Sequence, residues 1–426
     1  MMTNNSRGDG TFACQIKMAA WTCLMKNVSV TMGLAALLLA GAIQAEDITI
    51  KWQIKGDPLL TFYLPKVASD GLQNVALIAE GHTGSSALED EIGFYQALPT
   101  AKVDWSGSSN IYGPSEQKGQ APTIALAYDS KDDYDTAIEL HQGGQDSGSS
   151  LWFQLGTNAP PSFTGIGWGT ATRLAPGPWA CGPYPRGCGT FEFDSGYNAT
   201  VAADNNLGPA GIGDGNSATV VEVHQAAAGE SALYYHVGLL TLGASPSISW
   251  GPSLPFDSSG IIEGYAPTVS IANNVAVLVS QGSPGGSNLW YSIGAVDTAT
   301  STIAWTAPIP YGSGYNPTVS VWGSGPGVPF AGRVLVEAHQ VDNGKGSLVY
   351  SVGVLDGTSP TSITWSVTTS GSPNTNIPYA TGCYPSVALA WDGNAPPDDV
   401  SVTETHEANC GSATTTSYWY GHLIGK

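Results

Sequence analysis

Five Glu-x-His pairs recur along the chain, and they are the residues whose types and spacing are best suited to chemistry. A glutamate and a histidine two positions apart on a strand project from one face, because side chains alternate along an extended chain. Such a pair can accept hydrogen bonds from ligand hydroxyls, supply a general acid and base, or give two ligands to a metal. It can equally satisfy buried donors inside a core. The pairs are Glu80/His82, Glu139/His141, Glu222/His224, Glu337/His339 and Glu404/His406.

A sixth segment favours the structural interpretation of these pairs. There, Leu278 replaces the glutamate and Ser280 replaces the histidine together. Joint loss is expected of a mutually satisfied pair, because removing one partner alone would leave a buried charge or donor without a bond. We therefore predict that the pairs are buried and hydrogen-bonded between strands or between repeats, and that they hold no metal.

The residue after each histidine lies at the predicted end of a strand, next to a loop. Binding residues are frequent on loops that a rigid scaffold positions, so these side chains are better ligand-binding candidates than the pairs beneath them. In the first unit the equivalent residue is Thr83. The candidates in the other units are Gln142, Gln225, Gln281, Gln340 and Glu407.

The elements that must position these residues repeat six times. Each unit has an opening Pro-x-Val-like strand, a Glu-x-His strand followed by an aromatic strand, and, except in the last unit, a closing Ile-x-Trp-like strand. Four strands per unit at a period of 55 to 82 residues predict an all-β fold, a six-bladed β-propeller with four antiparallel strands per blade. The openings begin at Leu64, Ala121, Asn198, Ala266, Asn316 and Tyr384, and the closings end at Trp105, Trp168, Trp250, Trp305 and Trp365.

The last unit has no closing strand of its own, and an unassigned Ile-x-Trp strand lies at Ile48–Trp52. We predict that this N-terminal strand joins the last blade beside Tyr418–Leu423 and closes the ring. Closure would pair two otherwise open sheet edges. An open solenoid or a pair of sandwiches would leave the N-terminal strand unexplained.

Bulk composition limits the classes of partner. The net charge of −20, with only 14 lysines and arginines, disfavours nucleic acid and anionic lipid, because both need clustered basic residues.

Residues 1–45 have the features of a targeting segment, with Met25 as an alternative start and an uncharged run at Val28–Ile43. That run is short for a membrane span, although a membrane anchor is the alternative. We expect a secreted or periplasmic protein with one propeller domain at 46–426 and an insertion at 169–194, and no membrane span in the mature chain.

Four cysteines follow the targeting segment, and an exported chain would keep them oxidised. Cys383 and Cys410 flank the first two strands of the last unit and would lie side by side in an antiparallel pair. We predict a disulfide between them. Cys181 and Cys188 lie in the insertion and are also expected to be disulfide-bonded.

No catalytic or cofactor motif occurs in the sequence. The nucleophile elbow, the His-Glu-x-x-His helix and the phosphate-binding loop are all missing. Acidic stretches at 129–135, 204–214 and 392–399 could hold calcium, but they do not have the spaced carboxylates of a defined calcium loop. We predict no cofactor, and the sequence does not specify an oligomeric state.

The aromatic strands, such as Leu151-Trp152-Phe153 and Leu289-Trp290-Tyr291, together with the Ile-x-Trp closings, resemble those of secreted, lectin-like β-propellers. The resemblance implies sugar sites at each blade or blade interface. It favours a multivalent glycan-binding protein that is not an enzyme. A secreted carbohydrate-active enzyme or other hydrolase is the alternative. In that case we expect a lid or a unique pocket at the insertion residues Trp179, Tyr184 and Arg186. A structural envelope or matrix protein is the third interpretation.

Overall fold

All described residues lie in the compact unit Ala45–Lys426, and their regular elements are strands only. No helix among them has the length and apolar character that crossing a membrane requires. The targeting segment, His82, Cys181, Cys188 and the acidic stretch 392–399 lie outside the described residues, as does the insertion apart from Thr172–Arg173, so those predictions and the domain boundaries stay predictions. The computed structural model describes residues 48–55, 63–72, 74–80, 88–96, 102–105, 109–110, 119–129, 134–143, 150–158, 166–168, 172–173, 196–204, 216–256, 264–323, 333–344, 346–355, 357, 359–367, 375–391, 400–410 and 415–425.

One antiparallel pattern recurs in four separate sheets. An inner strand pairs with a second strand, the second with a third, and the third with an outer strand and a further short strand. Repeat 1 contains β2 (Tyr63–Ser69), β3 (Asn74–Glu80), β4 (Leu88–Gln96), β5 (Lys102–Trp105) and β6 (Ser109–Asn110). Repeat 2 contains β7 (Gly119–Asp129), β8 (Tyr134–Gly143), β9 (Leu151–Asn158), β10 (Gly167–Trp168) and β11 (Thr172–Arg173). Repeat 3 contains β12 (Tyr197–Asp204), β13 (Ser217–Gln225), β14 (Leu233–Thr241), β15 (Ser247–Trp250) and β16 (Leu254–Pro255). Repeat 4 contains β17 (Tyr265–Ala272), β18 (Val275–Gln281), β19 (Asn288–Asp297), β20 (Thr302–Trp305) and β21 (Ile309–Ser313).

The same pattern occurs twice more in an eight-stranded sheet, where the long strand β26 (Ile377–Trp391) serves two repeats. Its first part pairs with a third strand, and its second part, from Cys383, is an inner strand. Repeat 5 contains β22 (Tyr315–Trp322), β23 (Arg333–Gln340), β24 (Gly346–Leu355), β25 (Thr364–Trp365) and the start of β26. Repeat 6 contains the rest of β26, then β27 (Val400–Glu407), β28 (Thr416–Ile424) and β1 (Thr49–Lys55).

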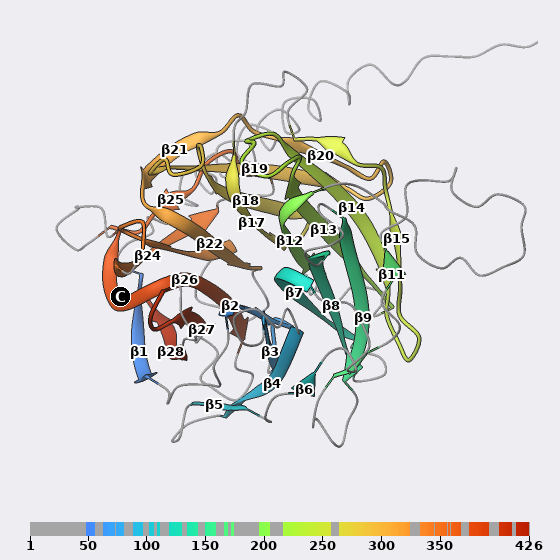
Figure 1. Cartoon of the computed structure of the whole chain (residues 1–426), viewed down its shortest axis with the longest axis horizontal. Coiled ribbons are helices and arrows are strands. Elements are labelled where there is room, and N and C mark those ends of the chain that lie inside the picture. Colours follow the sequence, from blue (N-terminus) through green and yellow to red (C-terminus); the bar gives the residue numbers. More distant parts are fainter. Residues whose placement is uncertain are drawn as a thin grey trace, which may run out of the picture. The chain divides into compact units, whose positions relative to one another are not determined.

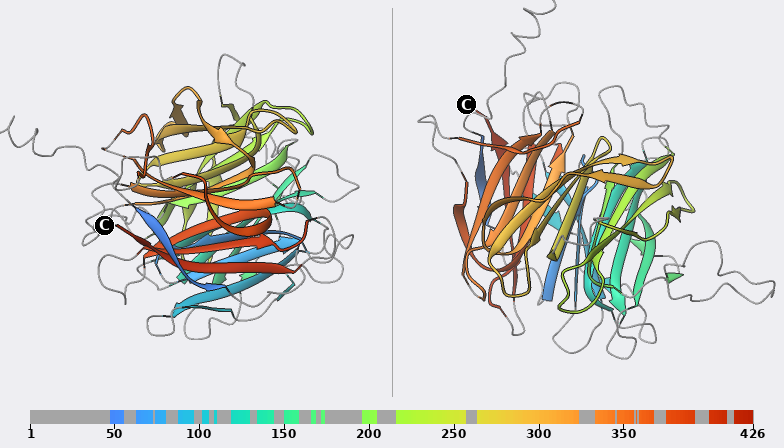
Figure 2. Two further views of the ribbon diagram at one scale, coloured as in Figure 1. Left: turned by 90° about the vertical axis from the view of Figure 1, so that its left-hand side faces the viewer. Right: turned by 90° about the horizontal axis from the view of Figure 1, so that it is seen from above.

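The N-terminal strand closes the last repeat, as the sequence predicted. β1 runs antiparallel to β28, with Thr49 opposite Ile424 and Ile50 opposite Leu423. In Figure 2, β1 (blue) lies beside the red strands of repeat 6. The two ends of the described chain therefore pair within one sheet.

The inner strands contact one another in a cycle, from β2 through β7, β12, β17, β22 and β26 and back to β2. Figure 1 shows these strands around the centre and the outer strands at the rim. Radial four-stranded antiparallel sheets in cyclic order define a β-propeller. Hydrophobic clusters fill the spaces between neighbouring repeats, for example between repeats 2 and 3.

The closing tryptophans account for much of this contact between repeats. Trp250 lies over Gly238, where an added Cβ would be 2.8 Å from the indole, so only glycine admits the ring. On its other side Trp250 meets Phe153 of repeat 2 edge-on, with centroids 6.0 Å apart. Trp52 on β1 meets Tyr350 in the same way at 5.9 Å. β1 thus supplies repeat 6 with the tryptophan that its own sequence lacks.

The predicted disulfide between Cys383 and Cys410 is present, with Cα atoms 5.6 Å apart. It joins the start of the inner part of β26 to the turn after β27. A crosslink of this kind stabilises the fold chiefly by restricting the unfolded chain.

Candidate functional site

The described Glu-x-His pairs lie buried in the second strand of four different repeats, so the fold does not bring them together. In each, the histidine Nδ1 donates to the glutamate of the same strand, at 2.8 Å in His141/Glu139 and 2.9 Å in His339/Glu337. His224 and His406 make the same bond. Burial opposes protonation of His339, but the Glu337 carboxylate outweighs it and leaves the pKa of His339 above its ordinary value.

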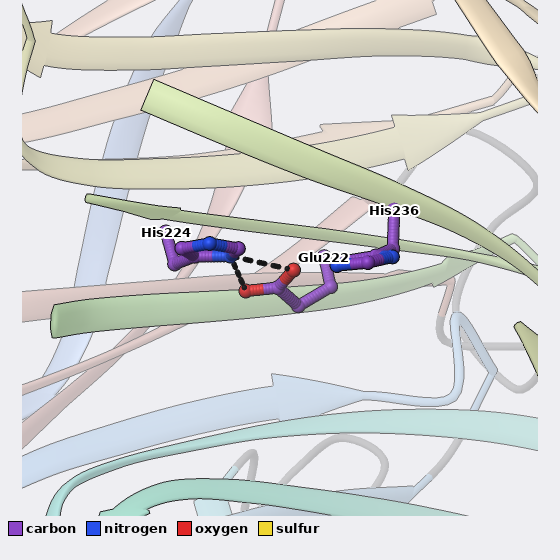
Figure 3. Close-up of side chains that lie close together, drawn as sticks. All are labelled: Glu222, His224 and His236. Carbon is purple, nitrogen blue, oxygen red and sulfur yellow. Dashed lines mark hydrogen bonds and ion pairs between the residues drawn. The ribbon is translucent and has the colours of Figure 1, made fainter. Parts of the chain in front are cut away.

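A third buried side chain joins the pair in repeat 3. His236 lies on β14 directly opposite Glu222, and Figure 3 shows His224 and His236 on either side of that carboxylate. One potential ligand atom from each residue lies within 4.8 Å of the others. Two imidazoles and a carboxylate are a donor set that zinc accepts. However, His224 is bonded to Glu222 as in the other pairs, and His236 Nδ1 lies 3.1 Å from the Gly251 carbonyl, so the cluster also fits a buried hydrogen-bond network.

The register of repeat 1 corrects the position that the sequence alignment gave to Glu80. Glu80 lies opposite Tyr63, just as Gln225 lies opposite Tyr197. It therefore occupies the strand-end position, not the position of Glu222. Leu77 and Ala79 take the places of the glutamate and histidine. The misalignment arose because a Glu-x-His match in sequence does not reveal which residue of the strand faces which partner.

The strand-end residues connect neighbouring repeats. In five of the repeats, a side-chain oxygen of the strand-end residue accepts a hydrogen bond from a backbone N–H at the start of the next inner strand. Gln281 Oε1 lies 2.8 Å from Asn316 N, and Glu407 Oε1 lies 2.9 Å from Leu64 N, which connects repeat 6 to repeat 1. The other such bonds are Glu80 to Ala121 N, Gln225 to Ala266 N and Gln340 to Tyr384 N.

The donors of these bonds all have a left-handed backbone. Leu64, Ala121, Ala266, Asn316 and Tyr384 have φ of 47° to 51°. Each lies where the pairing of the inner strand with the second strand shifts register. Such strained non-glycine conformations persist only when the surroundings stabilise them. The inter-repeat bond supplies that stabilisation.

These contacts give the strand-end side chains a structural role. Gln225, Gln281, Gln340 and Glu407 are buried, and Gln142 is half-buried. Gln340 Nε2 also donates to the Gly344 carbonyl at 2.8 Å, so its amide is held at both ends. Ligand binding by these residues stays a prediction.

A cavity of about 400 Å³ lies where the inner strands of the six repeats begin. We call it the axial pocket. Half-buried tyrosines contribute to its wall, and the rings of Tyr63 and Tyr384 lie 6.4 Å apart. A second cavity of about 330 Å³ lies further along the inner strands and has a largely aliphatic wall. The tyrosines of the axial pocket are Tyr63, Tyr265, Tyr315 and Tyr384.

Further along the inner strands, one position of each contributes a polar side chain to the wall of the axial pocket, and together these form a ring. Five of the six are hydroxyls, and the sixth is Lys66. Burial lowers the pKa of Lys66 to about 8. The hydroxyl residues are Thr123, Thr200, Thr268, Thr318 and Ser386.

Repeat 1 therefore differs in charge from the others. Its strand end and that of repeat 6 carry Glu80 and Glu407, where the other repeats have glutamine. Tyr63 lies between them, and burial, Tyr384 and both carboxylates raise the pKa of Tyr63 to about 12. Burial also raises the pKa of Glu80, against the effect of its bond from Ala121 N.

Sequence reasoning did not select Lys66, although a signal was present. The openings of the other units place threonine or serine at this position, and only the first reads Leu-Pro-Lys-Val-Ala. A single charged residue in an otherwise hydroxyl series could have been noticed. Its significance depends on the six positions meeting at one axis, which the alignment does not show.

Comparison with known proteins places the chain by fold. No protein-family model matches it, and no sequence among the curated proteins matches it. The haemagglutinin-neuraminidase ectodomain of parainfluenza virus 5 is similar in structure over 97% of this chain and 98% of its own, with a TM-score of 0.50 and 6% identity. A neuraminidase-like protein from A/bat/Guatemala/164/2009 covers 88% of this chain and 94% of its own, with a TM-score of 0.45 and 9% identity. The first likeness shows a shared β-propeller fold.

Proposed function

We propose that this protein is a carbohydrate-binding β-propeller whose site is the axial pocket. The observation that carries the proposal is the composition of that pocket: half-buried tyrosines surround a ring of hydroxyls in a cavity of about 400 Å³. Aromatic rings stack on the apolar faces of sugar rings, and a few placed polar groups fix orientation. The structurally similar viral ectodomain is named a haemagglutinin-neuraminidase, which agrees with a glycan ligand.

One axial site fits the geometry better than a site in each repeat. The strand-end amides that could have formed repeated sites are occupied by bonds between repeats. The second-strand pairs are buried. We therefore expect one ligand per chain, and multivalent binding by one chain is the competing prediction.

Export belongs to the proposal as well. The disulfide between Cys383 and Cys410 supports an oxidising compartment, since such bonds are rare in a reducing cytosol. The targeting features of residues 1–45 point the same way. We propose a secreted or periplasmic protein.

A glycan-processing enzyme is the second candidate, and the asymmetry of repeat 1 favours it. Lys66, Glu80 and Glu407 concentrate the unusual charged groups near one side of the axis, beside Tyr63, as catalysis would require. A Tyr63 pKa of about 12 keeps that phenol protonated near neutral pH, so it would act as a donor and not as a phenolate nucleophile.

A glycan array on the protein without residues 1–45 tests the proposal, followed by calorimetric titration of the best ligand. We expect binding with a stoichiometry near one, lost when Tyr265 and Tyr315 are changed to Ala. Matched controls replace Tyr234 and Trp290, half-buried rings outside the axial pocket, with Ala. Several equivalents per chain would support repeated sites, turnover of the bound glycan would support the enzyme, and no binding to any glycan would refute the proposed function.

A further inference from the structure

Lys66 is the one charged side chain among the described residues that line the axial pocket. The protein as a whole is strongly acidic, with a net charge of −20. A lysine is therefore an unexpected choice for the interior of the ring, and the positive charge needs an explanation.

The hydroxyls at the equivalent positions have a structural task. Ser386 Oγ accepts from Val67 N at 3.0 Å, and Thr200 Oγ1 accepts from Val269 N at 3.4 Å, so each joins two neighbouring inner strands. Thr268 donates to the Pro317 carbonyl at 2.9 Å and does the same. An ammonium cannot accept a hydrogen bond from a backbone N–H. Lys66 therefore cannot replace the accepting hydroxyls at the junction of repeats 1 and 2.

No carboxylate of the described residues forms an ion pair with Lys66. The acidic residues at the neighbouring strand ends are Glu80 and Glu407, and each is bonded to a backbone N–H, of Ala121 and Leu64 respectively. The other titratable groups of the pocket wall are the phenols of the four tyrosines. Partial burial of a cation that has no ion-pair partner among the described residues costs stability, and a role in binding would account for keeping the lysine at this position.

We propose that the axial pocket takes an acidic saccharide, one that carries a carboxylate or a sulfate, and that Lys66 binds the anionic group. This inference rests on the proposed function and specifies its ligand class. The tyrosines would contact the sugar ring while the ammonium of Lys66, further along the inner strand β2, would select for negative charge. A charge-assisted hydrogen bond in a partly desolvated site is among the stronger polar contacts available.

The lowered pKa of Lys66 makes this binding dependent on pH. An unliganded ammonium with a pKa of about 8 loses its proton as pH rises through 8. A bound anion favours the charged form and raises that pKa. Affinity for acidic saccharides should therefore be highest below pH 8 and fall above it, whereas affinity for neutral saccharides should not.

The test compares the wild type with Lys66→Met and with the matched control Lys51→Met, whose lysine is exposed on β1. The probes are glucuronate-containing and sulfated oligosaccharides, with neutral oligosaccharides of the same backbone. Lys66→Met should weaken binding of the acidic probes at least about tenfold and leave neutral binding unchanged. Lys51→Met should change neither.

A second measurement needs no variant. Amine-directed labelling at pH 8, read out by mass spectrometry, reports the reactivity of the Lys66 amine. The acidic probes should protect Lys66 from labelling. Neutral probes and inorganic sulfate serve as comparisons. Saccharide binding in which Lys66→Met leaves the affinity for the acidic probes unchanged, and in which those probes do not protect Lys66, would overturn this inference and leave the proposed function standing. Protection by sulfate alone, with no saccharide bound, would refute the proposed function and keep only an anion site. Absence of both would overturn both.

Discussion

At the scale of single residues, the protein accommodates its buried and half-buried titratable side chains in two different ways. In the four described Glu-x-His pairs, the two side chains bond to each other within one strand, with the acceptor and donor 2.8 Å apart in Glu139/His141. Lys66 has no such partner among the described residues. The first arrangement is expected to stabilise the repeat, and the second to cost stability in exchange for binding.

Removing one member of a pair should be costly. Glu222→Ala leaves His224 without its Nδ1 acceptor in a buried site, and we expect a loss of about 1 to 3 kcal/mol in urea unfolding. The double change Glu222→Leu with His224→Ser reproduces Leu278 and Ser280 of repeat 4, and it should cost less than the sum of the single changes. Equal stability of Glu222→Ala and the wild type would contradict a structural role for the pair.

Lys66→Met should stabilise the unliganded protein. The folded pKa of about 8 lies below the ordinary lysine value near 10.4, so between these values the unfolded chain binds more protons and wild-type stability rises with pH. The penalty from Lys66 is complete below pH 8 and disappears above about pH 10.5. Thermal melts of the wild type and of Lys66→Met across pH 6 to 10 check this. A stability gain from Lys66→Met that increases as pH rises would contradict the prediction.

At the scale of elements, the ends of the second strands hold the repeats together. Five strand-end side chains accept a hydrogen bond from the left-handed residue that begins the next inner strand, and the bond between Glu407 and Leu64 spans the junction of repeats 6 and 1. Neighbouring sheets that packed only through their aliphatic faces could shift relative to one another. These directional bonds fix where each repeat sits against the next.

Gln340→Ala separates the structural role from the binding role. The side chain accepts from Asn316 Nδ2 and from Tyr384 N, so its loss should destabilise the protein by about 1 to 3 kcal/mol. Glycan affinity of the folded fraction should be unchanged. Ser347→Ala, an exposed position on β24, is the matched control. Lost affinity with unaltered stability would instead support the ligand-binding role predicted from the sequence.

At the scale of the whole molecule, closure of the ring depends on one strand from the far end of the chain. Ile48 and Ile50 are buried beside residues of repeats 5 and 6, although more than 270 positions separate them in sequence from those neighbours. Ile48 N donates to Ser366 Oγ, and Ile50 N to Tyr350 OH. The strand therefore joins two repeats as well as completing one.

Deleting residues 46–52 should expose the edge of β28 and remove the burial of Ile48 and Ile50, each worth about 1.5 to 3 kcal/mol. We expect a markedly lower melting temperature and concentration-dependent association through the open edge. Calorimetry and light scattering measure the two effects. Lys51→Ala, at an exposed position of the same strand, should behave as the wild type, and a monomeric deletion variant of unchanged stability would refute the closure argument.

The sequence by itself determined the repeating strand pattern, the closing role of Ile48–Trp52 and the Cys383–Cys410 bond, because each follows from local alternation or from a count of missing strands. It did not determine the register of Glu80, which depends on which residue of the inner strand lies opposite, and it did not reveal that the strand-end amides bind the next repeat. The place of Lys66 was also decided only by the tertiary structure. Its neighbours in the ring, Thr123 and Ser386, are far away along the chain and meet it only at the axis. That no described carboxylate pairs with Lys66 is a property of this meeting point and not of any one segment.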